Sequence, residues 1–138
     1  MCIFKPISIS LSPNVERDDI WLAFKLLFNL WKWKRGKASE ELENGFKKYL
    51  GVEYAFSFNS GRSALMAILY SLGVDKGDEV LLQAFTCNAV VNPILDRGAN
   101  PIFVDVDDTI NMNPERLKRK ITSRAKAVMV QHNFGWPA

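Results

Sequence analysis

The residues with the clearest chemical potential stand at positions 59–63, where Asn-Ser-Gly-Arg-Ser joins a β-like run to an apolar helical stripe. Small residues at such a junction let the backbone approach a ligand, and the exposed N–H groups of a helix N-terminus favour an anion such as phosphate. Arg62 could add a two-pronged contact to that anion. A purely structural interpretation is also open, in which Ser60 caps the helix and Gly61 serves the turn. The pattern is neither a Walker loop nor a Gly-x-Gly-x-x-Gly dinucleotide loop.

Other reactive side chains have simpler explanations. Asp105, Asp107 and Asp108 follow a predicted strand without the remaining ligand spacing of a calcium loop, and acidic residues at such places usually shape a turn. His132 is the single histidine, and it could be either a hydrogen-bonding scaffold residue or a functional one. Cys87 could be a nucleophile at a helix start, but no histidine or cation is near it in the sequence. We therefore predict no metal site and no catalytic residue among these side chains.

The elements that must position these residues alternate regularly along the chain. Strands are predicted at 52–58, 79–83, 101–106 and 125–132, and helices at 65–72, 87–97 and 113–120, with Pro93 expected to kink the second helix. Strands that alternate with helices predict an α/β fold with a parallel sheet. Ligands of such sheets bind at the carboxyl ends of the strands, which is where the loop at 59–63 and the Cys87 loop would lie.

Residues 1–37 form a predicted N-terminal segment that contains an amphipathic helix. Its apolar face is Ile20, Phe24, Leu27, Phe28 and Trp31, with Asp18 and Asp19 at its start and the run 32–36 at its end. A second helix carries Leu42, Phe46, Tyr49 and Leu50 on one side. The basic, aromatic end of the first helix would suit a membrane surface. Packing on the same chain or on a partner subunit is the favoured interpretation.

Composition excludes several classes of protein. The chain has 138 residues, a net charge of +3 and two cysteines, which argues against a nucleic-acid partner and against a disulfide framework. Neither Met1–Pro13 nor Ile20–Trp33 has the length of a signal-peptide core or a membrane span, so a soluble, cytoplasmic protein is expected. After the last predicted strand only Asn133–Ala138 remain, with no helix to cover the sheet. We therefore expect the 138-residue chain to contain only part of this α/β domain.

An ordered series of motifs runs from about Leu42 to the last residue. Its elements are Leu-Gly-Val-Glu-Tyr-Ala at 50–55, Asn-Ser-Gly-Arg-Ser-Ala-Leu at 59–65, Gly-Asp-Glu-Val at 77–80, Phe85-Thr86 and Asn92, Gly-Ala-Asn-Pro-Ile-Phe-Val-Asp-Val-Asp at 98–107, Ile-Thr-Ser-Arg-Ala-Lys-Ala at 121–127 and His-x-x-Gly-x-Pro-Ala at 132–138. This series resembles the DegT/DnrJ/StrS family of pyridoxal-phosphate (PLP) sugar aminotransferases.

The resemblance implies an aspartate-aminotransferase-like fold (PLP fold type I), with a three-layer large domain around a mostly parallel sheet. Residues 38–138 would be the N-terminal part of that PLP-binding domain. It also implies a homodimer, and a loop at Gly61, Arg62 and Ser63 that holds the cofactor phosphate. The family often has threonine where Arg62 stands. The residue after Thr86 is usually an aromatic ring stacked on the pyridine, whereas here it is Cys87, whose polarisable sulfur could still pack on the ring.

The resemblance further implies that the catalytic lysine and the aspartate that pairs with the pyridinium nitrogen lie beyond Ala138. This chain alone would then be inactive, as the N-terminal part of an enzyme that moves an amino group from an amino acid to a nucleotide-linked keto-sugar. Two alternatives stay open: a PLP-dependent sugar dehydratase of the same family, and a noncatalytic PLP-binding, phosphate-binding or partner chain.

Overall fold

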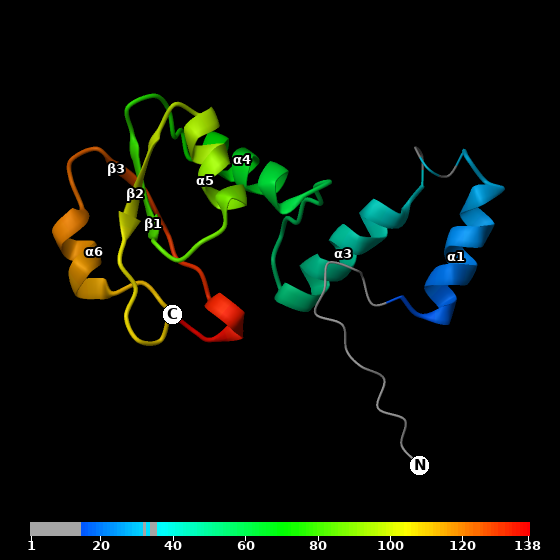
Figure 1. The fold of residues 1–138 in the computed structure, drawn as a ribbon. Helices are drawn as coiled ribbons and strands as arrows, with labels where there is room; N and C mark the ends of the chain where they lie inside the picture. Colours follow the sequence, from blue (N-terminus) through cyan, green and yellow to red (C-terminus); the bar gives the residue numbers. More distant parts are fainter. Residues whose placement is uncertain (1–14, 32, 34–35) are drawn as a thin grey trace, which may run out of the picture. The chain divides into compact units, whose positions relative to one another are not determined.

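The computed structural model describes residues 15–31, 33 and 36–138 (Figure 1). Its internal contacts divide the chain into two compact units, Met1–Phe56 and Ser57–Ala138. This division by contacts does not test the predicted domain boundary after residue 37, so that boundary stays a prediction.

The second unit is built on a small parallel sheet. Strands β1 (Glu79–Gln83), β2 (Asn100–Val104) and β3 (Ala125–Met129) lie in the order β2-β1-β3, and both pairs are parallel. β1 occupies the centre, and all five of its residues are buried. The three strands fall within the ranges that the sequence predicted, give or take a residue or two at their ends.

Helices cover both faces of this sheet (Figure 1). On one face, α4 (Gly61–Ser71) and α5 (Asn88–Asp96) pack over Val80 and Leu82 of β1. On the other face, Leu81 contacts the core that reaches α6 (Pro114–Lys120). Because side chains alternate along a strand, β1 supplies both cores, with Val80 and Leu82 on one face and Leu81 on the other. The predicted three-layer α/β architecture is confirmed.

The three helices begin where the sequence provides capping side chains. Ser60 Oγ accepts the N–H of Ser63 at 3.1 Å, and Asn113 Oδ1 accepts those of Glu115 and Arg116, each at 3.0 Å. Cys87 Sγ accepts the N–H of Ala89 at 3.4 Å. Each bond satisfies an N–H that has no carbonyl partner inside its helix.

The predicted strand at 52–58 is wrong, because the structure gives these residues no strand assignment and no ladder. Its apolar side chains are instead exposed, with Phe56 at 75% and Tyr54 at 66%. β-branched and aromatic residues favour a strand only when a neighbouring strand takes up the backbone hydrogen bonds. None of β1, β2 and β3 does so.

The first unit contains α1 (Arg17–Leu27) and α3 (Ala38–Leu50), and neither helix buries a residue. α1 starts as predicted, with Asp19 Oδ2 accepting the Glu16 N–H at 2.9 Å. It ends earlier than predicted, so Phe28 and Trp31 lie beyond it. The carbonyl of Leu26 accepts the Asn29 N–H at 3.0 Å and the Trp33 indole N–H at 2.8 Å, and these bonds close the last turn. Among the described residues, no helix has the length and hydropathy needed to cross a membrane.

Candidate functional site

Two helix N-termini meet the carboxyl edge of the sheet. α5 follows β1 directly, so its first turn lies where β1 ends. α4 precedes β1 and leads through a short turn into Glu79, so its last turn lies at the amino edge and its first turn at the carboxyl edge. α4 packs against α5 (Figure 1). Both helix dipoles therefore direct their positive ends to the edge at which parallel sheets bind ligands.

The first turn of α4 has two backbone donors available. The N–H of Ser63 is taken by Ser60 Oγ, and that of Ala64 is taken by the Ser60 carbonyl at 3.1 Å. The N–H groups of Gly61 and Arg62 precede the first intrahelical bond and so have no carbonyl partner in the helix. A Cβ on Gly61 would meet no atom of the described residues within 4 Å. The space beside this helix end is therefore open, and a ligand could approach the glycine backbone closely.

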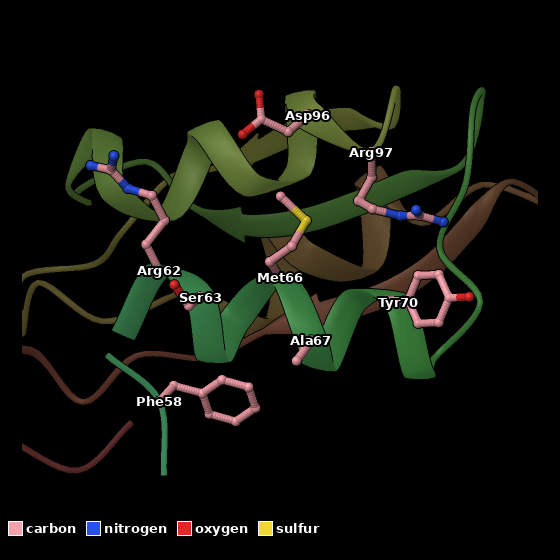
Figure 2. Close-up of a pocket in the computed structure, with 8 residues that line it drawn as sticks. All are labelled: Phe58, Arg62, Ser63, Met66, Ala67, Tyr70, Asp96 and Arg97. Carbon is pink, nitrogen blue, oxygen red and sulfur yellow. The ribbon is translucent and has the colours of Figure 1, made fainter. Parts of the chain in front are cut away.

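Arg62 and Ser63 also line a groove of about 560 Å³ on the outer side of α4 and α5. Figure 2 shows them at one end of the groove and Tyr70 and Arg97 at the other, with Met66 between them. The Arg97 guanidinium is held by the Val74 carbonyl at 2.9 Å and lies over the Tyr70 ring. Arg62 is exposed and has no ion pair among the described residues. Its charge is therefore available to an anion at the α4 N-terminus.

The carboxyl edge of the sheet carries buried polar atoms that lack hydrogen-bond partners in the described part of the chain. Gln83, the last residue of β1, is fully buried, and its Oε1 accepts the Gln131 N–H at 3.2 Å. Its Nε2, the Thr86 hydroxyl and the Gln131 Oε1 have no hydrogen-bond partner in the described part of the chain. Buried polar atoms are normally satisfied. An added group such as a water or a ligand at this edge would therefore be favourable.

The structure shows how the single side chains considered in the sequence analysis are bonded. Asp107 shapes a turn, because its Oδ1 accepts the N–H of Thr109 at 2.8 Å and its hydroxyl at 2.5 Å. Those bonds hold the pKa of Asp107 below its usual value. The His132 Nδ1 accepts the Ala138 N–H at 2.9 Å, as a scaffold residue does. No cluster of potential metal ligands occurs among the residues that the structure describes. Cys87 is an exposed free thiol at the start of α5.

Three residues of this edge were missed by sequence reasoning, namely Gln83, Gln131 and Asn133. Gln83 and Asn133 bond through their side chains to backbone far away in the sequence, such as Asn133 Nδ2 to the Ile110 carbonyl at 2.9 Å. Gln131 contributes its backbone N–H, which donates to the Gln83 side chain. Gln83 offered one signal, since it is a polar residue that directly follows the apolar run Val80, Leu81 and Leu82. The other two offered none.

Comparison with known proteins places the chain in a class. Residues 16–138 match the DegT/DnrJ/EryC1/StrS aminotransferase family, and the chain belongs to it. It is 38% identical over 126 residues to a GDP-perosamine synthase of Escherichia coli O157:H7, covering 91% of this chain and 35% of that protein. It is 33% identical to the spore coat polysaccharide biosynthesis protein SpsC of Bacillus subtilis, covering 96% and 33%. The chain thus spans about a third of these relatives' length.

The fold comparison agrees. The crystal structure of NtdA from Bacillus subtilis, which contains the cofactor PMP, superposes with a TM-score of 0.78 at 28% identity, over 88% of this chain and 29% of that one. The predicted aminotransferase fold is confirmed by this likeness.

The residues present fit the phosphate of PLP. At the α4 N-terminus lie two N–H donors without a carbonyl partner in the helix, the open Gly61, and the Arg62 guanidinium, which has no ion pair in the described part of the chain. Cys87, where the family resemblance implies an aromatic side chain, follows Thr86, whose buried hydroxyl has no hydrogen-bond partner among the described residues.

Proposed function

We propose that this chain is part of a PLP-dependent aminotransferase that moves an amino group from an amino acid to a nucleotide-linked keto-sugar. The observation that carries the proposal is the α4 N-terminus, with free N–H groups and the Arg62 charge at the ligand-binding edge, in a chain of a family of aminotransferases. The GDP-perosamine synthase relative favours a GDP-linked sugar.

In this proposal, Gly61 and Arg62 bind the cofactor phosphate through their backbone N–H groups, and the Ser63 hydroxyl and the Arg62 guanidinium add side-chain contacts. The Cys87 sulfur packs on the pyridine ring. PLP, when bound, supplies the electron sink for the reaction. The lysine and the ring-pairing aspartate that the chemistry also needs are assigned to no residue among these 138.

We also propose that the full-length protein is a homodimer that works in the cytoplasm, with small-molecule partners only. Sedimentation velocity of the full-length protein would give a single dimeric species, and a monomer at micromolar concentration would contradict the dimer.

The test of activity uses the full-length protein with PLP, a GDP-linked keto-sugar and each of the common amino acids in turn. We expect one 2-oxo acid to form for each amino sugar. Arg62→Ala should raise the PLP concentration needed for half-maximal activity by about tenfold, the loss of one charge-assisted bond. Loss of water from the sugar without a 2-oxo acid would instead favour the dehydratase, and PLP binding without turnover the noncatalytic chain.

A further inference from the structure

We propose that Asn133 is a positioning residue, which fixes the loop from β1 to α5 so that Thr86 and Cys87 can meet the cofactor ring. The role of that loop toward the cofactor depends on the function proposed above, whereas the clasp that Asn133 forms does not.

The Asn133 side chain joins three loops of the carboxyl edge. It lies four residues after the end of β3, and its Nδ2 donates to the Ile110 carbonyl at 2.9 Å and, at a longer 3.5 Å, to the Phe85 carbonyl. Ile110 lies in the loop after β2, and Phe85 in the loop after β1. Both partners can only accept, so the orientation of the amide is fixed. One half-buried side chain thus connects the chain segments that follow all three strands.

A second amide makes a similar connection in the opposite direction. Asn111, which is 4% exposed, donates from its Nδ2 to the Pro137 carbonyl at 2.9 Å. The loop after β2 therefore binds the segment 133–137 at two points. The rings of Phe85 and Phe134 lie 6.2 Å apart between centroids, which adds an apolar contact between the first loop and the same segment.

The backbone on both sides of the clasp is strained. Ile110 has φ 64° and Phe134 has φ 53°, a left-handed conformation that a β-branched or bulky residue rarely adopts. Such strain persists only where surrounding contacts over-determine it. The Asn133 amide bonds to the carbonyl of Ile110, and Asn133 directly precedes Phe134. Its side chain is therefore placed to stabilise both strained residues.

The consequence for the site lies in the first loop. Phe85 is one residue before Thr86 and two before Cys87, so the carbonyl that Asn133 holds belongs to the segment that would contact the ring. The phosphate end of the site is built differently, by the α4 N-terminus, whereas the side-chain hydrogen bonds of Asn133 go to Ile110 and Phe85. Loss of the clasp should therefore weaken binding of the ring and leave binding of phosphate alone unchanged.

The test compares Asn133→Asp with Asn100→Asp in the full-length protein. N133D keeps the shape but turns a carboxylate oxygen toward two carbonyls. Asn100 is a matched control, because its Nδ2 also donates to a backbone carbonyl at 3.5 Å, that of Gly77, at the opposite edge of the sheet. Amide hydrogen exchange should be about tenfold faster at residues 84–88 in N133D, and unchanged there in N100D. Unchanged exchange at 84–88 in N133D would overturn the proposal.

Two affinities complete the test. In N133D the Kd for PLP should rise about tenfold while the Kd for inorganic phosphate stays within twofold. An equal loss of both would mean a general structural effect and would overturn positioning. If the unaltered protein binds no PLP, the proposed function fails, and hydrogen exchange still decides whether the clasp holds the loop. Should N133D not fold, Asn133→Gln, which displaces the amide by one methylene, is expected to change exchange and affinity in the same directions.

Discussion

Removing the side-chain cap of α4 tests the proposed phosphate site, because a bound phosphate could replace the cap as the acceptor of the Ser63 N–H. In Ser60→Ala the Ser63 N–H loses its acceptor at 3.1 Å, and loss of a helix cap costs about 1 kcal/mol of stability. A phosphate at the same helix end would offer that N–H a new acceptor. Saturating phosphate, at a hundred times its Kd, adds about 2.7 kcal/mol to any protein that binds it only when folded. In S60A, phosphate should also restore most of the roughly 1 kcal/mol of stability lost with the cap. This corresponds to an affinity for phosphate about fivefold higher in S60A than in the wild type.

The assay is urea denaturation followed by circular dichroism, without phosphate and with saturating phosphate. Wild type and S60A should differ by about 1 kcal/mol without phosphate and by less than about 0.5 kcal/mol with it. Asn113→Ala is the control, since it removes the cap of α6, which accepts two N–H groups at 3.0 Å. Phosphate should leave the deficit of N113A unchanged. The reasoning is refuted if phosphate leaves the S60A deficit as large as before, or closes both deficits equally.

Three further predictions concern the core, the Asp107 turn and the buried Glu79. Leu81→Ala, at a fully buried position of β1 on the side of α6, should cost about 2–5 kcal/mol of stability in urea denaturation. Phe56→Ala, at a side chain that is 75% exposed, should change stability by less than about 0.5 kcal/mol. Similar losses in the two variants would place the core elsewhere. Thr109→Ala should raise the pKa of Asp107 toward its ordinary value, as read by NMR titration. Because the folded-state pKa is depressed, this turn contributes stability above the unfolded pKa and loses it as pH falls through the folded pKa, so an unshifted titration in T109A would contradict the assigned cause. The buried Glu79 carboxylate lies 2.6 Å from the Arg124 guanidinium and accepts a hydrogen bond from the Thr122 hydroxyl. Arg124→Ala should destabilise the fold by about 1–3 kcal/mol, because it leaves this carboxylate with the hydroxyl alone. Unchanged stability in R124A would show that solvent screens the ion pair completely.

The sequence predicted the elements of the second unit well where local chemistry decides them. Asn113 followed by Pro114 marked the start of α6, and the predicted helix at 87–97 is observed with Cys87 and Arg97 as its caps. Capping, turn and periodicity signals act over a few residues, so they can be read along the chain.

The errors occur where distant residues decide. The run 52–58 has the composition of a strand but no partner in β1, β2 or β3. α1 ends at Leu27, and the carbonyl of Leu26 accepts the indole N–H of Trp33, seven residues further on. The Asn133 clasp joins loops more than twenty residues apart, and no local pattern could indicate it.

The candidate site was predicted in part. The structure brings the α4 and α5 N-termini, with the loop at 60–63 and Cys87, to the same edge of the sheet. The identity of the bound group came from the family resemblance rather than from geometry, because a helix N-terminus recognises any small anion.

The most direct test of the central claim compares pyridoxal phosphate with pyridoxal, by isothermal titration of the full-length protein. If Gly61, Arg62 and Ser63 hold the cofactor phosphate, PLP should bind about a hundredfold more tightly than pyridoxal, the worth of two charge-assisted hydrogen bonds. Inorganic phosphate should compete with PLP, and Arg62→Ala should reduce the difference between the two ligands. Equal affinities for PLP and pyridoxal would contradict the account.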